Sequence, residues 1–225
     1  MVKRALVQRR PWLMVALLFG VSWWFIDGGG MPGTYQIAWK GAGVGALALY
    51  AFQRHLKLDG TLIAAAMAFA AMGDMALELM TEVGGALFAI SHVFAIWLYQ
   101  RNRRARLAFS QKLFAIVLMV AVPVITWLLT MGQAGQGLVT VYSVLVAGMA
   151  AMAWTSRFPR YRVGFGALLF VLSDLILFAS GGAGEGMPLL AKLVWPLYFT
   201  GQVMIVTGVV SQLRKERGAV ASAEG

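Results

Sequence analysis

The most constraining feature of this sequence is the way its charges alternate between successive apolar runs. Eight apolar runs follow one another, and basic residues occur before the first, after the last and in every second connection. These segments hold 17 of the 19 lysines and arginines, whereas the intervening connections hold none. Basic loops remain on the cytoplasmic side of a membrane. The alternation therefore predicts a multi-pass membrane protein with both termini in the cytoplasm.

The apolar runs also have roughly the length that such a protein requires. A spanning helix needs about 20 mostly apolar residues, and most of the runs approach that length. They cover residues 11–26, 36–53, 59–80, 84–100, 112–130, 137–154, 163–180 and 188–212. We predict an all-α membrane protein with a single eight-helix transmembrane domain over residues 1–217, followed by a disordered tail over 218–225. If the source is bacterial, its location is the plasma (inner) membrane.

Composition excludes several other classes of protein. Charged residues make up 12% of the chain, against about 25% in a soluble domain. The formal charge of +10 is explained by the basic loops, so no nucleic-acid partner is expected. Cysteine is absent, which excludes disulfides and thiolate zinc sites. The glycine-rich connections lack the Gly-Lys-Ser/Thr of a phosphate-binding loop.

Two aspartates interrupt the apolar runs, and these are the candidate catalytic residues. Asp74 lies in the third run and Asp174 in the seventh, both from the middle of the membrane outward. Ionisable groups in hydrocarbon are costly and usually functional. The alternative is that each aspartate only hydrogen-bonds a neighbouring helix. Glu78 shares a helix face with Asp74, although it lies near the outer end, where it can reach water.

The positions of the two aspartates suggest a faint internal repeat. The third and seventh runs correspond in two four-helix halves, and His92 in the fourth run aligns loosely with Gln202 in the eighth. Such halves would have the same orientation in the membrane and would bring Asp74 and Asp174 together. The match rests on few residues and is equally consistent with chance.

Other polar residues in the runs have both a functional and a structural interpretation. Lys40 and Lys192 can extend to the membrane surface, and Lys40 can instead pair with a carboxylate or a phosphate. His92, Tyr142, Tyr198 and Gln202 are equally suited to helix packing. A histidine-ligated zinc hydrolase is set aside because the chain has only two histidines. Ser173 has no evident base, so a serine hydrolase is not supported.

At these positions the sequence resembles the YhhN family of membrane proteins, which includes the lysoplasmalogenases. The resemblance covers nearly the whole chain, and it depends on the order of several short segments rather than on one motif. Those segments are Trp39-Lys40, Gly73-Asp74, Phe88 to His92, Tyr142, Gly166 to Asp174 and Tyr198 to Gln202. One departure is visible, since the family often has proline after the lysine and here Gly41 follows it.

The resemblance implies an enzyme that hydrolyses the vinyl ether bond of lysoplasmalogens. The products would be a fatty aldehyde and glycerophosphoethanolamine or glycerophosphocholine. The expected partners are therefore a lysophospholipid substrate and membrane lipids, and the sequence gives no indication of oligomeric state.

Two carboxyl groups suit this reaction. Protonation of the outer alkene carbon gives an oxocarbenium ion, which water captures. The reaction needs a protonated acid, favoured by burial, and a carboxylate that stabilises the cation, as in glycosidases. We expect Asp74 and Asp174 to share these roles without a metal or other cofactor.

Six further residues are expected to bind the substrate. Lys40 would hold the phosphate or an ionised carboxylate, and His92, Tyr198 and Gln202 would bind water or the glycerol hydroxyl. Tyr142 and Ser173 complete the predicted binding set. Two alternatives are a proton-coupled transporter, in which buried aspartates relay protons, and a lysolipid-binding sensor. Transporters often contain helices interrupted by proline or glycine. Here only Pro123 and Pro196 fall well inside the runs, which argues against a transporter.

Overall fold

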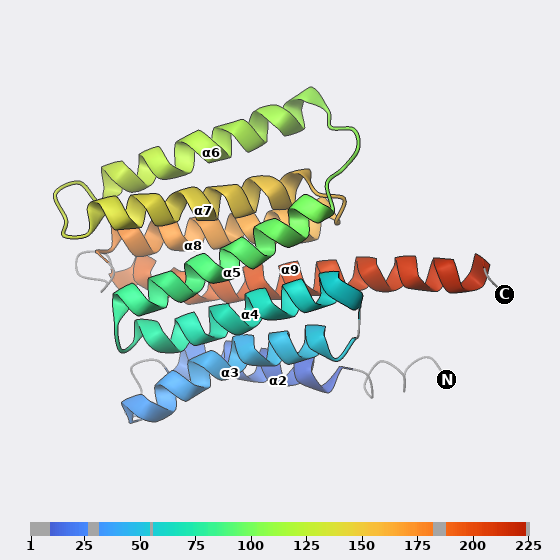
Figure 1. The fold of residues 1–225 in the computed structure, drawn as a ribbon. Helices are drawn as coiled ribbons and strands as arrows, with labels where there is room; N and C mark the ends of the chain where they lie inside the picture. Colours follow the sequence, from blue (N-terminus) through green and yellow to red (C-terminus); the bar gives the residue numbers. More distant parts are fainter. Residues whose placement is uncertain (1–9, 27–31, 55, 182–187, 224–225) are drawn as a thin grey trace. The chain divides into compact units, whose positions relative to one another are not determined.

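The computed structural model describes residues 10–26, 32–54, 56–181 and 188–223. Over these residues the chain is all-α, with eight α-helices (Figure 1). The helices are α2 (Pro11–Ile26), α3 (Gly33–Phe52), α4 (Lys57–Leu77), α5 (Thr81–Arg101), α6 (Phe109–Leu129), α7 (Gln136–Thr155), α8 (Phe165–Ala179) and α9 (Pro188–Ala223). A short π-helix, η1 (Arg160–Gly164), leads directly into α8. Each predicted run corresponds to one of these helices.

Six helical segments are long and apolar enough to cross a membrane. They are α4, α5, α6, α7, η1 together with α8, and the part of α9 from Leu189 to Ala219. Helix α2 is apolar but shorter, and α3 is less apolar because Gln36, Lys40 and several glycines lie within it. The chain is thus an integral multi-pass membrane protein. That all eight helices span the bilayer, and that both termini are cytoplasmic, remain predictions.

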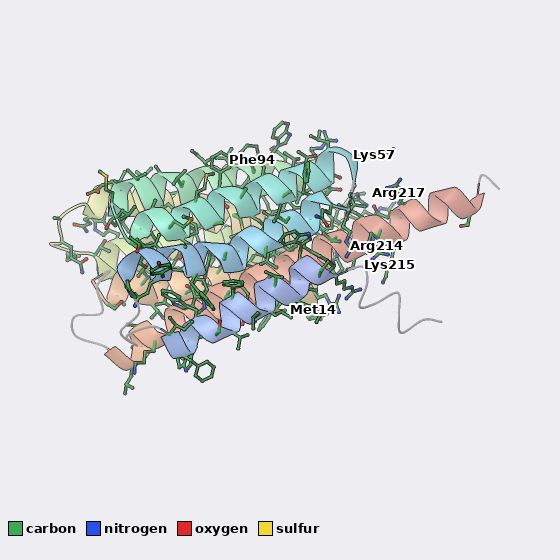
Figure 2. The ribbon with its side chains drawn as sticks, turned by 90° about the horizontal axis from the view of Figure 1, so that it is seen from below. Met14, Lys57, Phe94, Arg214, Lys215 and Arg217 are labelled. Carbon is green, nitrogen blue, oxygen red and sulfur yellow. The ribbon has the colours of Figure 1, made fainter. Side chains whose placement is uncertain are left out.

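Helix α9 extends beyond the predicted eighth run. It continues to Ala223, so residues 218–223 are helical where the sequence predicted a disordered tail. The segment after Leu213 is charged but contains good helix formers. It is also supported by a hydrogen bond from Gln212 Nε2 to Glu216 Oε1, four residues later, at 2.9 Å. Figure 2 shows Arg214, Lys215 and Arg217 projecting from this part of the helix.

Some residues that support the sequence predictions lie outside the described part of the chain. They are three of the basic residues before the first run (Lys3, Arg4 and Arg9), two acidic residues of the connections without basic residues (Asp27 and Glu185), one of the two histidines (His55, in a basic connection), and the last two residues of the predicted tail.

The helices form two compact units, Met1–Phe94 and Ala95–Gly225, which divide within α5. In the first unit, α3 packs against both α2 and α4. The beginning of α5 packs against α4, because Ser91 Oγ donates a hydrogen bond to the carbonyl of Ala66 at 2.7 Å. The rings of Phe69 and Phe94 stack with centroids 5.4 Å apart.

The second unit contains two tightly packed helix pairs, α6 with α7 and α8 with α9. In the pair α8–α9, Ser173 Oγ donates to the carbonyl of Val194 at 3.1 Å. Two turns earlier on α8, Gly166 lies opposite Gly201: a Cβ added to Gly201 would come within 2.6 Å of the Gly166 carbonyl oxygen. Glycines at this crossing allow the two backbones to approach closely.

This close approach makes a testable prediction about stability. Replacing Gly201 with alanine is expected to lower the thermal unfolding temperature in detergent, because backbone, rather than a flexible side chain, blocks the added methyl group. Gly218→Ala is the matched control on the same helix, since nothing lies within 4 Å of a Cβ there. At an open helical position alanine is more stabilising than glycine, so the control should unfold at the wild-type temperature or above. Equal unfolding temperatures for the two variants would contradict the prediction.

Arg157 joins three segments of the second unit. Its Nε donates to Asn102 Oδ1 at 2.7 Å, and its backbone N–H donates to the Asn102 carbonyl at 2.8 Å. Its guanidinium also forms an ion pair with Glu216 on α9. This arginine therefore fastens the end of α5 and the start of η1 to α9. The sequence analysis gave it only a role in membrane orientation.

Candidate functional site

The predicted site residues are divided between the two units. Lys40, Asp74 and His92 belong to the first, and Tyr142, Ser173, Asp174, Tyr198 and Gln202 belong to the second.

In the second unit, two predicted site residues, Asp174 and Tyr142, are joined by a hydrogen bond. Asp174 lies on α8 and is 8% exposed. The hydroxyl of Tyr142, on α7, donates a hydrogen bond to Asp174 Oδ2 at 3.1 Å. The Tyr142 ring packs edge-on against Phe178, one turn beyond Asp174, with centroids 6.1 Å apart. Burying a polar group without a partner is costly, so Tyr142 both stabilises and orients the carboxyl group.

The other predicted residues of this unit surround the same part of α8. Ser173 turns toward α9, where its hydroxyl bonds the Val194 carbonyl. Tyr198 packs against Phe170, one turn before Asp174, with ring centroids 5.4 Å apart. Gln202 is buried one turn further along α9. Neighbouring side chains of α8 thus face different helices: Asp174 faces α7, and Ser173 faces α9.

In the first unit, Asp74 and His92 are both buried, each only 2% exposed. Gly73, which precedes Asp74, faces the ring of Phe88 on α5: an added Cβ would lie 2.8 Å from that ring. A larger side chain at position 73 would therefore have to displace the Phe88 ring. Two of the short segments that carry the family resemblance, Gly73-Asp74 and Phe88 to His92, meet at this contact.

Lys40 has a carboxylate partner, Glu78, as one of its two interpretations required. Its Nζ lies 2.5 Å from Glu78 Oε1, just beyond the end of α4. The same Nζ is 5.7 Å from the centre of the Trp23 ring, which also favours a cation. Glu78 therefore neutralises a lysine in addition to its access to the surface.

Thr126 is among the buried polar residues that the sequence analysis did not select. Thr126, on α6, is fully buried, and its hydroxyl has no hydrogen-bond partner within the described chain. A threonine in an apolar run gives little indication of function in the sequence, because the hydroxyl of a helical threonine commonly bonds its own backbone. Within the same described residues, no three His, Asp or Glu side chains lie close enough to hold a metal ion.

These features define the class of protein, an all-α multi-pass membrane protein with carboxyl groups buried in its apolar helices. The chain belongs to the YhhN family, whose model matches residues 35–209. This family includes lysoplasmalogenases. The matched range runs from α3 into α9 and contains every predicted site residue. No match was found among curated proteins or among solved structures.

Proposed function

We propose that this protein is a membrane-embedded hydrolase that cleaves the vinyl ether bond of lysoplasmalogens. The proposal rests on a buried carboxyl group, Asp174, hydrogen-bonded by Tyr142 inside apolar helices. It also rests on membership of a family that includes lysoplasmalogenases. Buried ionisable groups in membrane helices usually serve a function, and this reaction requires a general acid, which a buried carboxyl group can supply.

The chemistry balances with two carboxyl groups and one water molecule. A carboxylic acid transfers its proton to the outer alkene carbon, and the ether oxygen supplies electrons to form an oxocarbenium ion. Water adds to the cationic carbon and gives a proton to a carboxylate, which leaves a hemiacetal. The hemiacetal hydroxyl proton then passes to the glycerol oxygen as that C–O bond breaks. The products are a fatty aldehyde and the glycerophospho alcohol. The proton taken from water then returns from the second carboxyl group to the first, directly or through water, and this restores the acid.

We assign the acid and the carboxylate to Asp74 and Asp174, in either order. Support for Asp74 comes from its burial in α4, which is apolar from Leu62 to Gly73. Lys40, on α3, would bind the phosphate, with Glu78 as its partner when no substrate is bound. The other predicted residues would bind substrate hydroxyls or water: His92, Tyr142, Ser173, Tyr198 and Gln202.

The direct test uses purified protein and two lipids that differ by one double bond. We expect a lysoplasmalogen to release free aldehyde, and the saturated 1-O-alkyl lysolipid with the same head group to release none. The reason is that only the alkene can accept the proton. Aldehyde can be followed by coupling to an aldehyde dehydrogenase or by mass spectrometry.

Other outcomes would replace the proposal. Substrate-dependent proton flux in proteoliposomes without aldehyde release would indicate a transporter. Saturable binding of both lipids without chemistry would indicate a lysolipid sensor. Cleavage of the saturated ether would show that alkene protonation is not the reaction.

A further inference from the structure

Thr126 differs from the other threonines whose helical hydroxyl contacts are defined. Thr61, Thr130, Thr140, Thr155 and Thr207 each donate to the carbonyl four residues earlier, at 2.6 to 3.2 Å. The equivalent acceptor for Thr126 would be Val122, and that bond is not made. The Thr126 hydroxyl therefore lacks the local acceptor that these other threonines use.

An unpaired hydroxyl in this setting needs an explanation. Thr126 has 0% exposure, and leaving a buried hydroxyl unsatisfied costs about 1–3 kcal/mol. Within the described residues nothing satisfies it. A partner from outside the protein would remove this cost.

The packing of α6 and α7 shows where Thr126 lies. The two helices are antiparallel neighbours (Figure 1), with Phe114 against Trp154 at a 4.7 Å ring separation. Nearer the connection between them, Gln136 Nε2 donates to the Trp127 carbonyl at 3.0 Å. Thr126 lies about one turn before the end of α6, and Tyr142 lies less than two turns after the start of α7, so both residues are near the connected ends of this helix pair. Helix α6 also contacts α8, the helix that carries Asp174.

We propose that the Thr126 hydroxyl hydrogen-bonds a hydroxyl-bearing ligand bound at the Tyr142–Asp174 pair. The identity of this ligand rests on the proposed function. That function supplies two candidates, the free 2-hydroxyl of the lysolipid glycerol and the attacking water. Threonine suits both, because its hydroxyl can donate and accept at once. A site that bonds a substrate hydroxyl discriminates strongly against an analogue that lacks it, so Thr126 would favour lysolipids over lipids acylated at that position.

The test compares three substitutions on α6. Thr126→Val keeps the shape and removes the hydroxyl, and Thr126→Ser keeps the hydroxyl. Thr130→Val is the matched control, since Thr130 is also buried but bonds the Thr126 carbonyl. We expect Thr126→Val to lower kcat/KM about tenfold or more, the scale of one lost hydrogen bond. Thr126→Ser and Thr130→Val should remain near wild type, and Thr126→Val should unfold no earlier than wild type.

A second substrate shows which hydroxyl Thr126 contacts. It is a vinyl ether lipid with hydrogen in place of the glycerol 2-hydroxyl, and the loss caused by Thr126→Val is measured with both substrates. A loss confined to the hydroxyl-bearing substrate identifies the glycerol hydroxyl. An equal loss of kcat with both substrates identifies water. Wild-type kinetics for Thr126→Val, or an equal loss in Thr126→Ser, would overturn the inference.

Failure of the proposed function would be visible separately. If wild-type protein releases no aldehyde, that function fails and binding of the saturated 1-O-alkyl lysolipid decides the role of Thr126. Binding that is weaker for Thr126→Val than for Thr130→Val supports the inference, and equal binding rejects it.

Discussion

Replacement of Asp174 by asparagine is expected to reduce aldehyde release by about 10³-fold, within the range that general acid–base groups contribute. Asparagine has nearly the same shape as aspartate, and its amide oxygen can still accept the Tyr142 hydrogen bond. It cannot deliver a proton to the alkene or take one from water. The loss should therefore appear in kcat, while substrate binding and folding are retained.

Folding and chemistry are separated by measuring both on the same samples. Gel filtration and thermal unfolding in detergent should match wild type, and single-turnover aldehyde release should not. Asp59→Asn, near the start of α4, makes the same change outside the proposed site and should keep wild-type turnover. Tyr142→Phe removes only the donor to Asp174 and should give an intermediate loss. Full activity of Asp174→Asn would exclude this carboxyl group from the chemistry.

The helices were predictable because the properties that define them are local. The apolar runs and the charges between them appear directly in the sequence, and all eight runs correspond to observed helices. The end of α9 was not predictable by the same means, because polarity after Leu213 indicates where a span ends and not where a helix ends. The link from Arg157 to Asn102 and Glu216 joins residues that lie far apart in the chain, and no local pattern marks it.

The site was predictable by residue type and much less by contact. Asp174 and Tyr142 were both candidates, but their hydrogen bond depends on how α7 and α8 are rotated about their own axes. The same limit applies to Lys40, whose partner Glu78 depends on how α3 and α4 pack. Thr126 could not have been selected, since what distinguishes it is the bond to Val122 that it does not make.

Asp74→Asn is expected to reduce aldehyde release to about the same extent as Asp174→Asn, and combining the two should add little. If each carboxyl group worked independently, the double variant would lose the product of the two factors, about 10⁶-fold from the range given for one such group. Groups that act as a unit on one substrate are strongly non-additive, because the first loss already disables the step that the second group serves. We therefore expect the rate of aldehyde release by the double variant to lie within tenfold of the rate of the less active single variant.

This comparison tests the joint action of the two aspartates directly. The measurement is single-turnover aldehyde release over long incubations, corrected for hydrolysis of the lipid in empty micelles, with Asp59→Asn as the control for an amide on α4. A multiplicative loss would mean that Asp74 and Asp174 serve separate steps. Unchanged turnover in Asp74→Asn alone would leave Asp174 as the only required carboxyl group. A single acid would then have to protonate the alkene and, as its conjugate base, accept the proton from the attacking water.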